Sequence, residues 1–219
     1  MKITALKRRK NRIRVHIDGG EEPRVELAED LVVRERLAVG DPLDPDRLAA
    51  LEAEDEILRA REAALRLLAH RARSEAELRR RLERKEFAPP IVAQTLGWLE
   101  ERGYVDDAAF AASFVRDRLR LRPRGRVALL QELRRKGVAA DVAEAAVEGT
   151  MRDEEVDEAG LALEAAESWA RRNRPVIRTA RGGDPEQRLR ARRRLYGHLA
   201  RRGFAPDAVR AAVAAVLGD

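Results

Sequence analysis

The feature that most constrains this chain is a short pattern of apolar residues that occurs three times. In each copy two leucines lie four residues apart, and a third apolar residue follows five residues after the second leucine. The three copies are Leu78, Leu82 and Phe87; Leu129, Leu133 and Val138; and Leu195, Leu199 and Phe204. Basic residues precede the third apolar residue in every copy, as expected where a helix ends and cations meet its last carbonyl groups. The pattern predicts three similar helical units.

The spacing of the copies indicates the size of one unit. Phe87 and Val138 are 51 residues apart, which accommodates three helices of ordinary length and their loops. Val138 and Phe204 are 66 residues apart, and we expect the 15 additional residues to form an exposed, Arg-rich loop near 171–185. Because such a unit cannot bury its apolar face alone, we predict an elongated tandem array of three three-helix repeats.

The first 27 residues have a different pattern, which is typical of β-strands. Residues 12–17 alternate polar and β-branched side chains, the period of a half-buried strand. Residues 2–6 and 24–27 are further strand candidates, and turn-forming residues separate the three segments. Three short strands are marginally stable alone, so we expect this β-meander to pack on a helix that begins near Ala28.

From Asp44 onward every segment is predicted to be helical. Asp44 is a candidate N-cap with Pro45 at the first helical position, and the helix that follows can continue to about Arg71. Ser74 and Glu77 have the spacing of a capping box. The fold class is therefore mainly α, with a small N-terminal β-meander plus helix. The expected parts are the β-meander and short helix (1–43), a linker helix with the first three-helix repeat (44–105), the second repeat (106–152), and the third repeat with its Arg-rich loop (153–219).

The sequence lacks the signatures of enzymes. It contains no cysteine, no glycine-rich phosphate loop, and no His-Glu-x-x-His or Gly-x-Ser-x-Gly motif. His16, His70 and His198 lie on separate predicted elements, which is more typical of surface or core histidines than of metal ligands. We therefore expect no enzymatic activity, no catalytic residue, no metal and no cofactor.

The apolar runs of the chain are short. None approaches the roughly 20 residues that cross a bilayer. The apolar stretch after Lys2 ends at Leu6, which is too short for the core of a signal peptide. A cytoplasmic protein is expected.

Positive charge is concentrated toward the C-terminus. The chain has 45 Lys and Arg against 39 Asp and Glu, a formal net charge of +6. Residues 158–219 hold 13 basic and 7 acidic groups, and 40 of the 45 basic residues are Arg. Arg forms bidentate pairs with phosphate and carboxylate groups. This composition indicates either an anionic partner or a preference for Arg on solvated helix faces.

Arginine-rich segments supply the candidate binding residues. From 116 to 126 every second residue is Arg, and among these residues only Asp117 offsets them. Uncompensated charges are too costly to bury, so this corner is either solvated or faces an anion. Further clusters occupy 171–181 and 188–194. The candidate partner- or DNA-binding residues are Arg116, Arg118, Arg120, Arg122, Arg124, Arg126, Arg188, Arg192 and Arg193.

Three-helix units suggest a helix-turn-helix protein, but the charges argue against sequence-specific reading of DNA. A helix that reads the major groove needs basic and amide side chains on its outer face. The last helix of the second unit carries Asp141, Glu144 and Glu148 and no basic residue up to Gly149. Such a helix would repel phosphate.

Three segments resemble the RecX regulators of the RecA recombinase. Residues 64–82 read Ala-Leu-x2-Leu-Ala-x-Arg-x-Arg-Ser-Glu-x-Glu-Leu-x3-Leu, which matches the family's first-repeat signature. Residues 103–111 read Gly-Tyr-Val-Asp-Asp-x2-Phe-Ala, with Val105 in place of the usual Leu. Residues 124–138 resemble the family stretch that ends in Lys-Gly-Ile. The resemblance is close over 63–157 and looser over the third unit.

The resemblance implies a cytoplasmic, non-enzymatic regulator. RecX proteins are elongated arrays of three-helix repeats that lie in the groove of the RecA–DNA filament or block its growth. They suppress its ATP hydrolysis, strand exchange and co-protease activity. The implied partners are the RecA filament and single- or double-stranded DNA, bound weakly and without sequence specificity. No membrane partner is implied, and the chain is expected to be a monomer.

Two alternatives stay open at this point. The first is a DNA-binding or transcription-regulating protein that acts directly on nucleic acid through its basic faces. The second is a helical scaffold whose arginines only keep it in solution.

Overall fold

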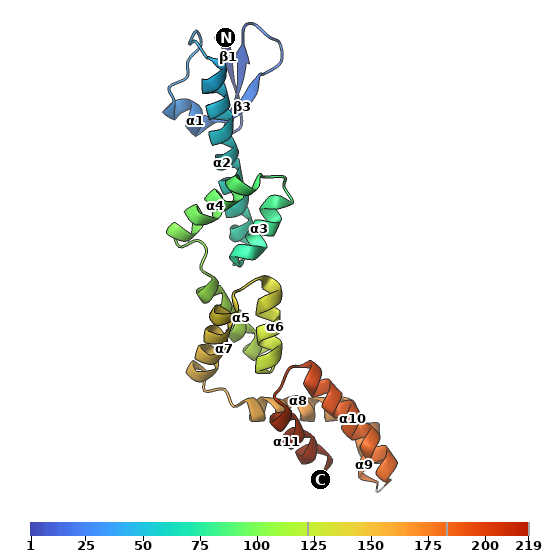
Figure 1. Cartoon of the computed structure of the whole chain (residues 1–219). Helices are drawn as coiled ribbons and strands as arrows, with labels where there is room; N and C mark the ends of the chain where they lie inside the picture. The colour runs from blue at the N-terminus through green and yellow to red at the C-terminus, as the bar shows by residue number, and fades with distance from the viewer. Residues whose placement is uncertain (122, 183, 219) are drawn as a thin grey trace. The chain divides into compact units, whose positions relative to one another are not determined.

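The computed structural model describes residues 1–121, 123–182 and 184–218, which form three strands and eleven helices (Figure 1). The chain divides into two compact units. The first comprises Met1–Ala72 and Leu78–Tyr104, and the second comprises Arg73–Glu77 and Val105–Asp219. The predicted fold class, mainly α with a small N-terminal sheet, is confirmed.

The first unit begins with an antiparallel sheet of strand order β1-β2-β3. The strands are β1 (Ile3–Arg9), β2 (Arg12–Ile17) and β3 (Val25–Ala28). The register places Ile13 opposite Leu27 and Val15 opposite Val25. Ile13, Val15 and Leu27 are all buried. The alternation in the sequence thus sets which face of the sheet packs inward, and the β-meander is confirmed.

Two helices pack on this sheet, α1 (Glu29–Arg34) and α2 (Pro45–His70). Their contribution to the apolar core shared with the strands includes Leu31, Val32, Leu48 and Leu51. The carboxylate of Asp55 on α2 is buried; it accepts from the backbone N of Ala28 at 2.7 Å and pairs with Arg12 at 2.6 Å. The sequence predicted only the helix near Ala28 beneath the sheet, and α2 adds a second support.

The N-terminal end of α2 follows its sequence signal. Oδ1 of Asp44 accepts from the backbone N of Arg47 at 2.8 Å, and Pro45 is the first helical residue. The C-terminal half of α2 forms the first repeat with α3 (Glu75–Glu83) and α4 (Pro89–Glu101). One helix therefore serves both the sheet and the first repeat.

The second unit holds two further repeats. The second repeat consists of α5 (Asp107–Leu121), α6 (Arg126–Lys136) and α7 (Ala140–Asp153). Phe110 is buried in its core, and the half-buried Phe114 packs against that core with the two ring centroids 6.3 Å apart. The third repeat consists of α8 (Glu158–Arg172), α10 (Pro185–Arg201) and α11 (Pro206–Leu217), with α9 (Arg174–Arg181) inserted after α8.

The prediction of an Arg-rich loop near 171–185 is wrong. Most of that segment is helical, because Pro175 stands in the first turn of α9, where a proline starts a helix rather than breaking it. Ile177 and Ala180 of α9 are buried in the core of the third repeat. The arginines of this segment therefore project from a packed helix, and α9 lies along α10.

The three copies of the sequence pattern occupy equivalent places. All six leucines of the pattern are completely buried. The residue before the third apolar residue takes a positive φ in every copy: 66° at Glu86, 87° at Gly137 and 76° at Gly203. This left-handed residue ends the helix so that its last carbonyl groups are bonded. Only the first copy has a residue with a side chain at this position.

In the described part of the chain, no helix combines the length and the apolar character needed to cross a bilayer.

The left-handed residue at position 86 leads to a first prediction. Glu86→Gly should stabilise the protein by about 0.5–1 kcal/mol, because relief of left-handed strain exceeds the added flexibility of the unfolded chain. Urea-induced unfolding of the full chain measures the change. Gly137→Ala is the matched control at the equivalent position, and it should destabilise by about 1 kcal/mol or more. A destabilised Glu86→Gly variant would contradict this explanation of the repeat.

Candidate anion-binding site at the joint between the second and third repeats

The second and third repeats meet through their backbones at two glycines. The backbone N of Gly125 donates to the carbonyl O of Arg202 at 2.9 Å, and that of Val127 donates to Gly203 at 3.1 Å. A Cβ atom on Gly125 would lie 2.2 Å from the carbonyl O of Gly203, and one on Gly203 would lie 2.2 Å from the backbone N of Ala128. Each contact excludes any side chain. Glycine at both positions is therefore a condition for this joint.

A carboxylate completes the joint. Oε1 of Glu158, at the start of α8, accepts from the backbone N of Arg126 at 3.1 Å and from that of Ala205 at 3.2 Å. These amides lie at the N-terminal ends of α6 and α11, where helices leave amide groups without partners of their own. One side chain thus bonds two helix ends from different repeats, and its negative charge suits their dipoles.

The joint gathers positive charge. Arg124 precedes Gly125, and Arg202 precedes Gly203, so the glycine contact brings the two arginines together. Arg172 approaches from α8: the rings of Trp169 and His198 lie 6.4 Å apart, and Arg172 and Arg202 follow them by three and four residues on the same helix faces. Arg124, Arg172 and Arg202 are called the joint cluster below.

Electrostatics support this convergence. Burial lowers the pKa of Arg202, and the positive charges of Arg124 and Arg172 lower it further. Burial also lowers the pKa of His198, followed by the charges of Arg202, Arg172 and Arg201. The Nε2 atom of His198 is buried without a hydrogen-bond partner among the described residues. The joint is thus a place of positive potential that disfavours a further proton.

This arrangement is suited to an anion from outside the chain. Guanidinium groups bind phosphate and carboxylate through paired, charge-assisted hydrogen bonds. Glu158 already accepts from two backbone amides, and Oε1 of Glu132 lies 3.5 Å from Nε of Arg124. Nε of Arg172 donates to the carbonyl O of Ser168, and neither Arg172 nor Arg202 forms an ion pair with another described residue. An added anion would therefore reduce the repulsion within the cluster.

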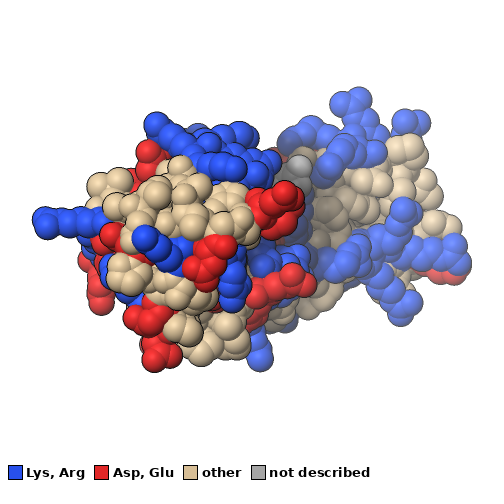
Figure 2. Space-filling view, turned by 90° about the horizontal axis from the view of Figure 1, so that it is seen from above, with Lys and Arg blue, Asp and Glu red and all other residues tan. Residues whose placement is uncertain are grey.

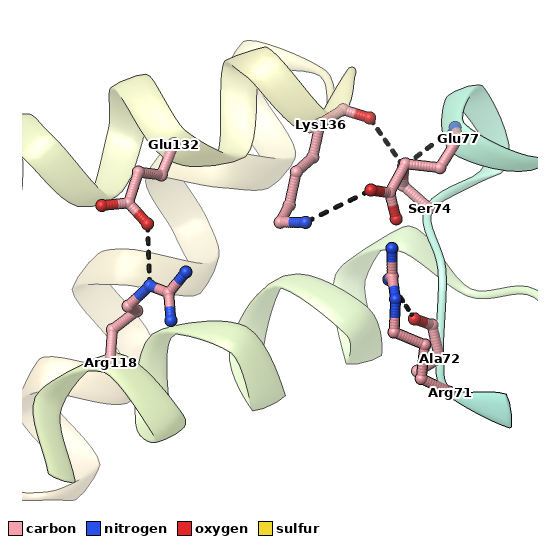
Figure 3. A network of polar contacts seen from close by, with 7 residues as sticks. All are labelled: Arg71, Ala72, Ser74, Glu77, Arg118, Glu132 and Lys136. Atoms are coloured by element: carbon pink, nitrogen blue, oxygen red, sulfur yellow. Dashed lines mark hydrogen bonds and ion pairs between the residues drawn. The ribbon is translucent and has the colours of Figure 1, made fainter. Parts of the chain in front are cut away.

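The alternating arginines predicted from the sequence are mostly paired within the protein. Arg116 lies 2.9 Å from Glu154, Arg118 lies 2.7 Å from Glu132 and Arg126 lies 2.6 Å from Glu148. Figure 3 shows the pair of Arg118 and Glu132, which joins α5 to α6. The prediction that only Asp117 offsets these arginines is therefore wrong. In the folded chain they also pair with carboxylates from positions distant in sequence.

The remaining predicted residues are distributed over two places. Arg120 is exposed on α5, and Arg122 lies outside the described residues. Arg188, Arg192 and Arg193 are exposed on α10. Arg192 precedes Arg202 by ten residues, or about 15 Å along a helix. These three arginines therefore flank the joint cluster and do not form it. Among the eight predicted residues that the structure describes, only Arg124 belongs to the cluster.

Lys136, at the basic end of α6, is half-buried and contacts Ser74 and Glu77 (Figure 3). Oγ of Ser74 donates to the carbonyl O of Lys136 at 2.6 Å and accepts from the backbone N of Glu77 at 3.2 Å, the N-cap bond that the sequence predicts. Nζ of Lys136 lies 3.3 Å from Oε1 of Glu77 and over the rings of Phe110 and Phe114. Lys136 therefore holds the end of α6 next to the start of α3.

The face of the protein seen in Figure 2 shows mixed charge. In Figure 2, Lys and Arg side chains (blue) gather in patches on one face, with Asp and Glu side chains (red) between some of them. The number of arginines in a sequence segment is therefore a poor guide to a binding site. The joint cluster is distinguished by arginines that repel one another, a property that the linear sequence does not display.

The glycine contact leads to a second prediction. Gly125 has φ −73° and ψ 163°, which any residue can adopt, so Gly125→Ala adds only a steric clash. It should destabilise the joint by about 1–3 kcal/mol and speed exchange of the amide hydrogens of 125–127 by about tenfold or more. Hydrogen exchange followed by mass spectrometry measures this protection.

The control for this variant is Gly97→Ala. A Cβ atom on Gly97, in the middle of α4, meets nothing within 4 Å. This variant should leave the joint unchanged and stabilise α4 slightly. Unaltered exchange at 125–127 in Gly125→Ala would show that the two repeats are not held by the glycine contact.

Comparison with known proteins places the fold. The family models described as RecX, first three-helix domain, and RecX, second three-helix domain, match residues 60–99 and 106–147. A crystal structure of regulatory protein RecX is similar with a TM-score of 0.72 and 25% identity, over 96% of this chain and 98% of that one. The structure of RecX from Lactobacillus salivarius, at 17% identity, is similar in fold with a TM-score of 0.59 over 74% of this chain and 97% of that one.

Sequence relatives agree with the structures. Regulatory protein RecX of Mycolicibacterium vanbaalenii is 37% identical over 166 residues, or 74% of this chain and 85% of the relative. Regulatory protein RecX of Halorhodospira halophila is 40% identical over 160 residues, or 73% of this chain and 89% of the relative. With matched repeat domains, a shared fold and this level of identity, the chain belongs to the RecX family of regulatory proteins.

Proposed function

We propose that this protein is a negative regulator of the RecA recombinase. In this proposal it binds the RecA–DNA filament and suppresses its ATP hydrolysis, strand exchange and co-protease activity, and so modulates recombination and DNA repair. Membership in a family of regulatory proteins supports the proposal. The structural observation that carries it is the joint cluster, where Arg124, Arg172 and Arg202 converge at a backbone joint.

A nucleoprotein filament offers the kind of ligand that this cluster fits. Its DNA carries phosphates at regular spacing, and its protein carries carboxylates. The three arginines repel one another in the folded protein. A bound anion would offset this repulsion, and the offset would add to the free energy of binding. In this proposal Arg120 and Arg193, both exposed, extend the surface on either side. Arg188 and Arg192 lie on the same helix as Arg193.

The ion-paired arginines have a different place in the proposal. Arg116, Arg118 and Arg126 would have to leave their carboxylate partners before binding an external anion. That exchange costs part of the energy gained. We therefore rank Arg116, Arg118 and Arg126 below the joint cluster as contacts for the filament.

The structure offers little support for sequence-specific reading of duplex DNA. The outer face of α7 presents Asp141, Glu144 and Glu148, all exposed, and Glu148 is already paired with Arg126. On α11, Asp207 and Arg210 pair with each other. A helix in the major groove needs free donors for base edges. Direct regulation of transcription therefore has less support than regulation of RecA.

The third prediction tests the joint cluster. A variant with Arg124, Arg172 and Arg202 all changed to Ala should inhibit the DNA-dependent ATP hydrolysis of RecA about tenfold or more less effectively. Its melting temperature should be unchanged or slightly higher, because the substitution removes like charges that repel. The slope of affinity against salt concentration should also become shallower.

A second triple variant is the matched control. Arg171, Arg190 and Arg210 are in the same unit and carry the same charge, but each pairs with a carboxylate on its own helix. Changing these three to Ala should leave inhibition nearly unchanged. If the two triple variants inhibit RecA equally well, the joint cluster does not contact the filament. If the parent leaves RecA unaffected and binds one duplex sequence tightly, the protein is a direct DNA regulator.

A further inference from the structure

The end of α4 carries an aromatic pair that is separate from the joint cluster. The ring of Trp98 lies 6.0 Å from the ring of Tyr104, with 31° between their planes. Gly103, with φ 68°, reverses the chain after α4, and the backbone N of Tyr104 then donates to Leu99 at 2.9 Å. This turn places Tyr104 beside Trp98. All of these residues belong to the first unit.

Two arginines lie against the same indole. The guanidinium carbon of Arg61, from α2, is 4.8 Å from the ring centroid of Trp98, and that of Arg102 is 4.5 Å from it. Both distances are typical of cation–π contacts. The aromatic pair and the two guanidinium groups together form a platform of flat, π-bearing groups, called the Trp98 platform below.

The platform is open to an external ligand. Tyr104 is 54% exposed and the side chain of Arg102 is 50% exposed. The Nε atom of Arg61 is buried, so it is the exposed guanidinium of Arg102 that offers donors at the surface. An exposed aromatic ring beside an exposed guanidinium has capacity for both stacking and hydrogen bonding.

The charge of the platform is positive. Burial lowers the pKa of Arg61, and the neighbouring charge of Arg102 lowers it further, against the opposing effect of Glu101 and Glu54. Glu101 lies 4.0 Å from Arg102 and has a side chain that is 77% exposed. At that distance and exposure it offsets Arg102 only in part. The aromatic faces thus lie beside incompletely compensated positive charge.

Stacking surfaces interleaved with guanidinium groups match one chemical class of ligand. Bases of a single strand have free π-faces, and the phosphates that join them seek cations. A duplex keeps its base faces stacked and hidden, so it cannot use Tyr104 in this way. We propose that the Trp98 platform binds single-stranded nucleic acid, with a base stacked on Tyr104 and the backbone phosphates on Arg102 and Arg61. This site is independent of RecA and of the joint cluster.

The fourth prediction tests this site with the full chain and a fluorescently labelled oligothymidylate of about fifteen nucleotides. Tyr104→Ala should weaken binding about five- to hundredfold, whereas Tyr104→Phe, which keeps the ring, should bind nearly as the parent does. Arg102→Ala should weaken binding and reduce its dependence on salt. Tyr196→Ala is the matched control, because Tyr196 is 39% exposed on α10 and belongs to the other unit.

An abasic strand of the same length separates stacking from charge. The parent should bind it more weakly than oligothymidylate, and Tyr104→Ala should bind the two strands alike. Trp98 gives a second readout: oligothymidylate should quench the tryptophan emission of the parent, since Trp169, the other tryptophan, is only 8% exposed. Equal affinity of the parent for the abasic strand, or an unchanged affinity in Tyr104→Ala, would overturn the proposal. A protein ligand instead of nucleic acid would give that second result.

Discussion

The contact between Gly125 and Gly203 determines how the second and third repeats are joined. Each of these repeats has its own apolar core, and the link between them consists of backbone hydrogen bonds and the carboxylate of Glu158. Backbone bonds have narrow geometry, so a joint of this kind is more specific than an apolar interface of equal size. It also demands two glycines, because a Cβ atom at either position would overlap the backbone of the other repeat. The orientation of everything attached to the joint follows from this constraint.

The glycine contact also fixes the positions of the two arginines that precede the glycines. Arg124 and Arg202 cannot separate while the glycine contact holds, and Arg172 joins them through the contact of Trp169 with His198. Gathering three cations is tolerable because each keeps access to water, whose high dielectric weakens the repulsion. Several other arginines of this unit pair with carboxylates, as Arg118 does with Glu132. The joint therefore brings together arginines that are distant in sequence, and this cluster is the anion-binding site that we propose. In the proposed function, this cluster binds phosphates or carboxylates of the nucleoprotein filament.

The sequence predicted the features that depend on neighbours along the chain. The period of two in β2, the cap at Asp44 and the six buried leucines all follow from local spacing, and all are confirmed. It is wrong at α9, because the Arg-rich segment near 171–185 is predicted to be a loop although Pro175 occupies a helix start. It also could not pair Arg116 with Glu154 or bring Arg202 beside Arg124, because these contacts join segments that are distant in sequence. Gly203 was visible only as a helix cap, and its second role, close contact with α6, exists only in the folded chain. The Trp98 platform also exists only in the folded chain, since Arg61 and Trp98 come from different helices.

The imidazole of His198 tests the anion-binding claim most directly. Its pKa is lowered by burial and by the charges of Arg202, Arg172 and Arg201, so an anion at the joint cluster should raise it and cause uptake of a proton. NMR titration of the full chain in inorganic phosphate and in sodium chloride of equal ionic strength measures this effect. The account predicts a higher His198 pKa in phosphate, and no such difference in the variant that lacks Arg124, Arg172 and Arg202. The same His198 pKa in phosphate and in chloride for the parent would contradict it.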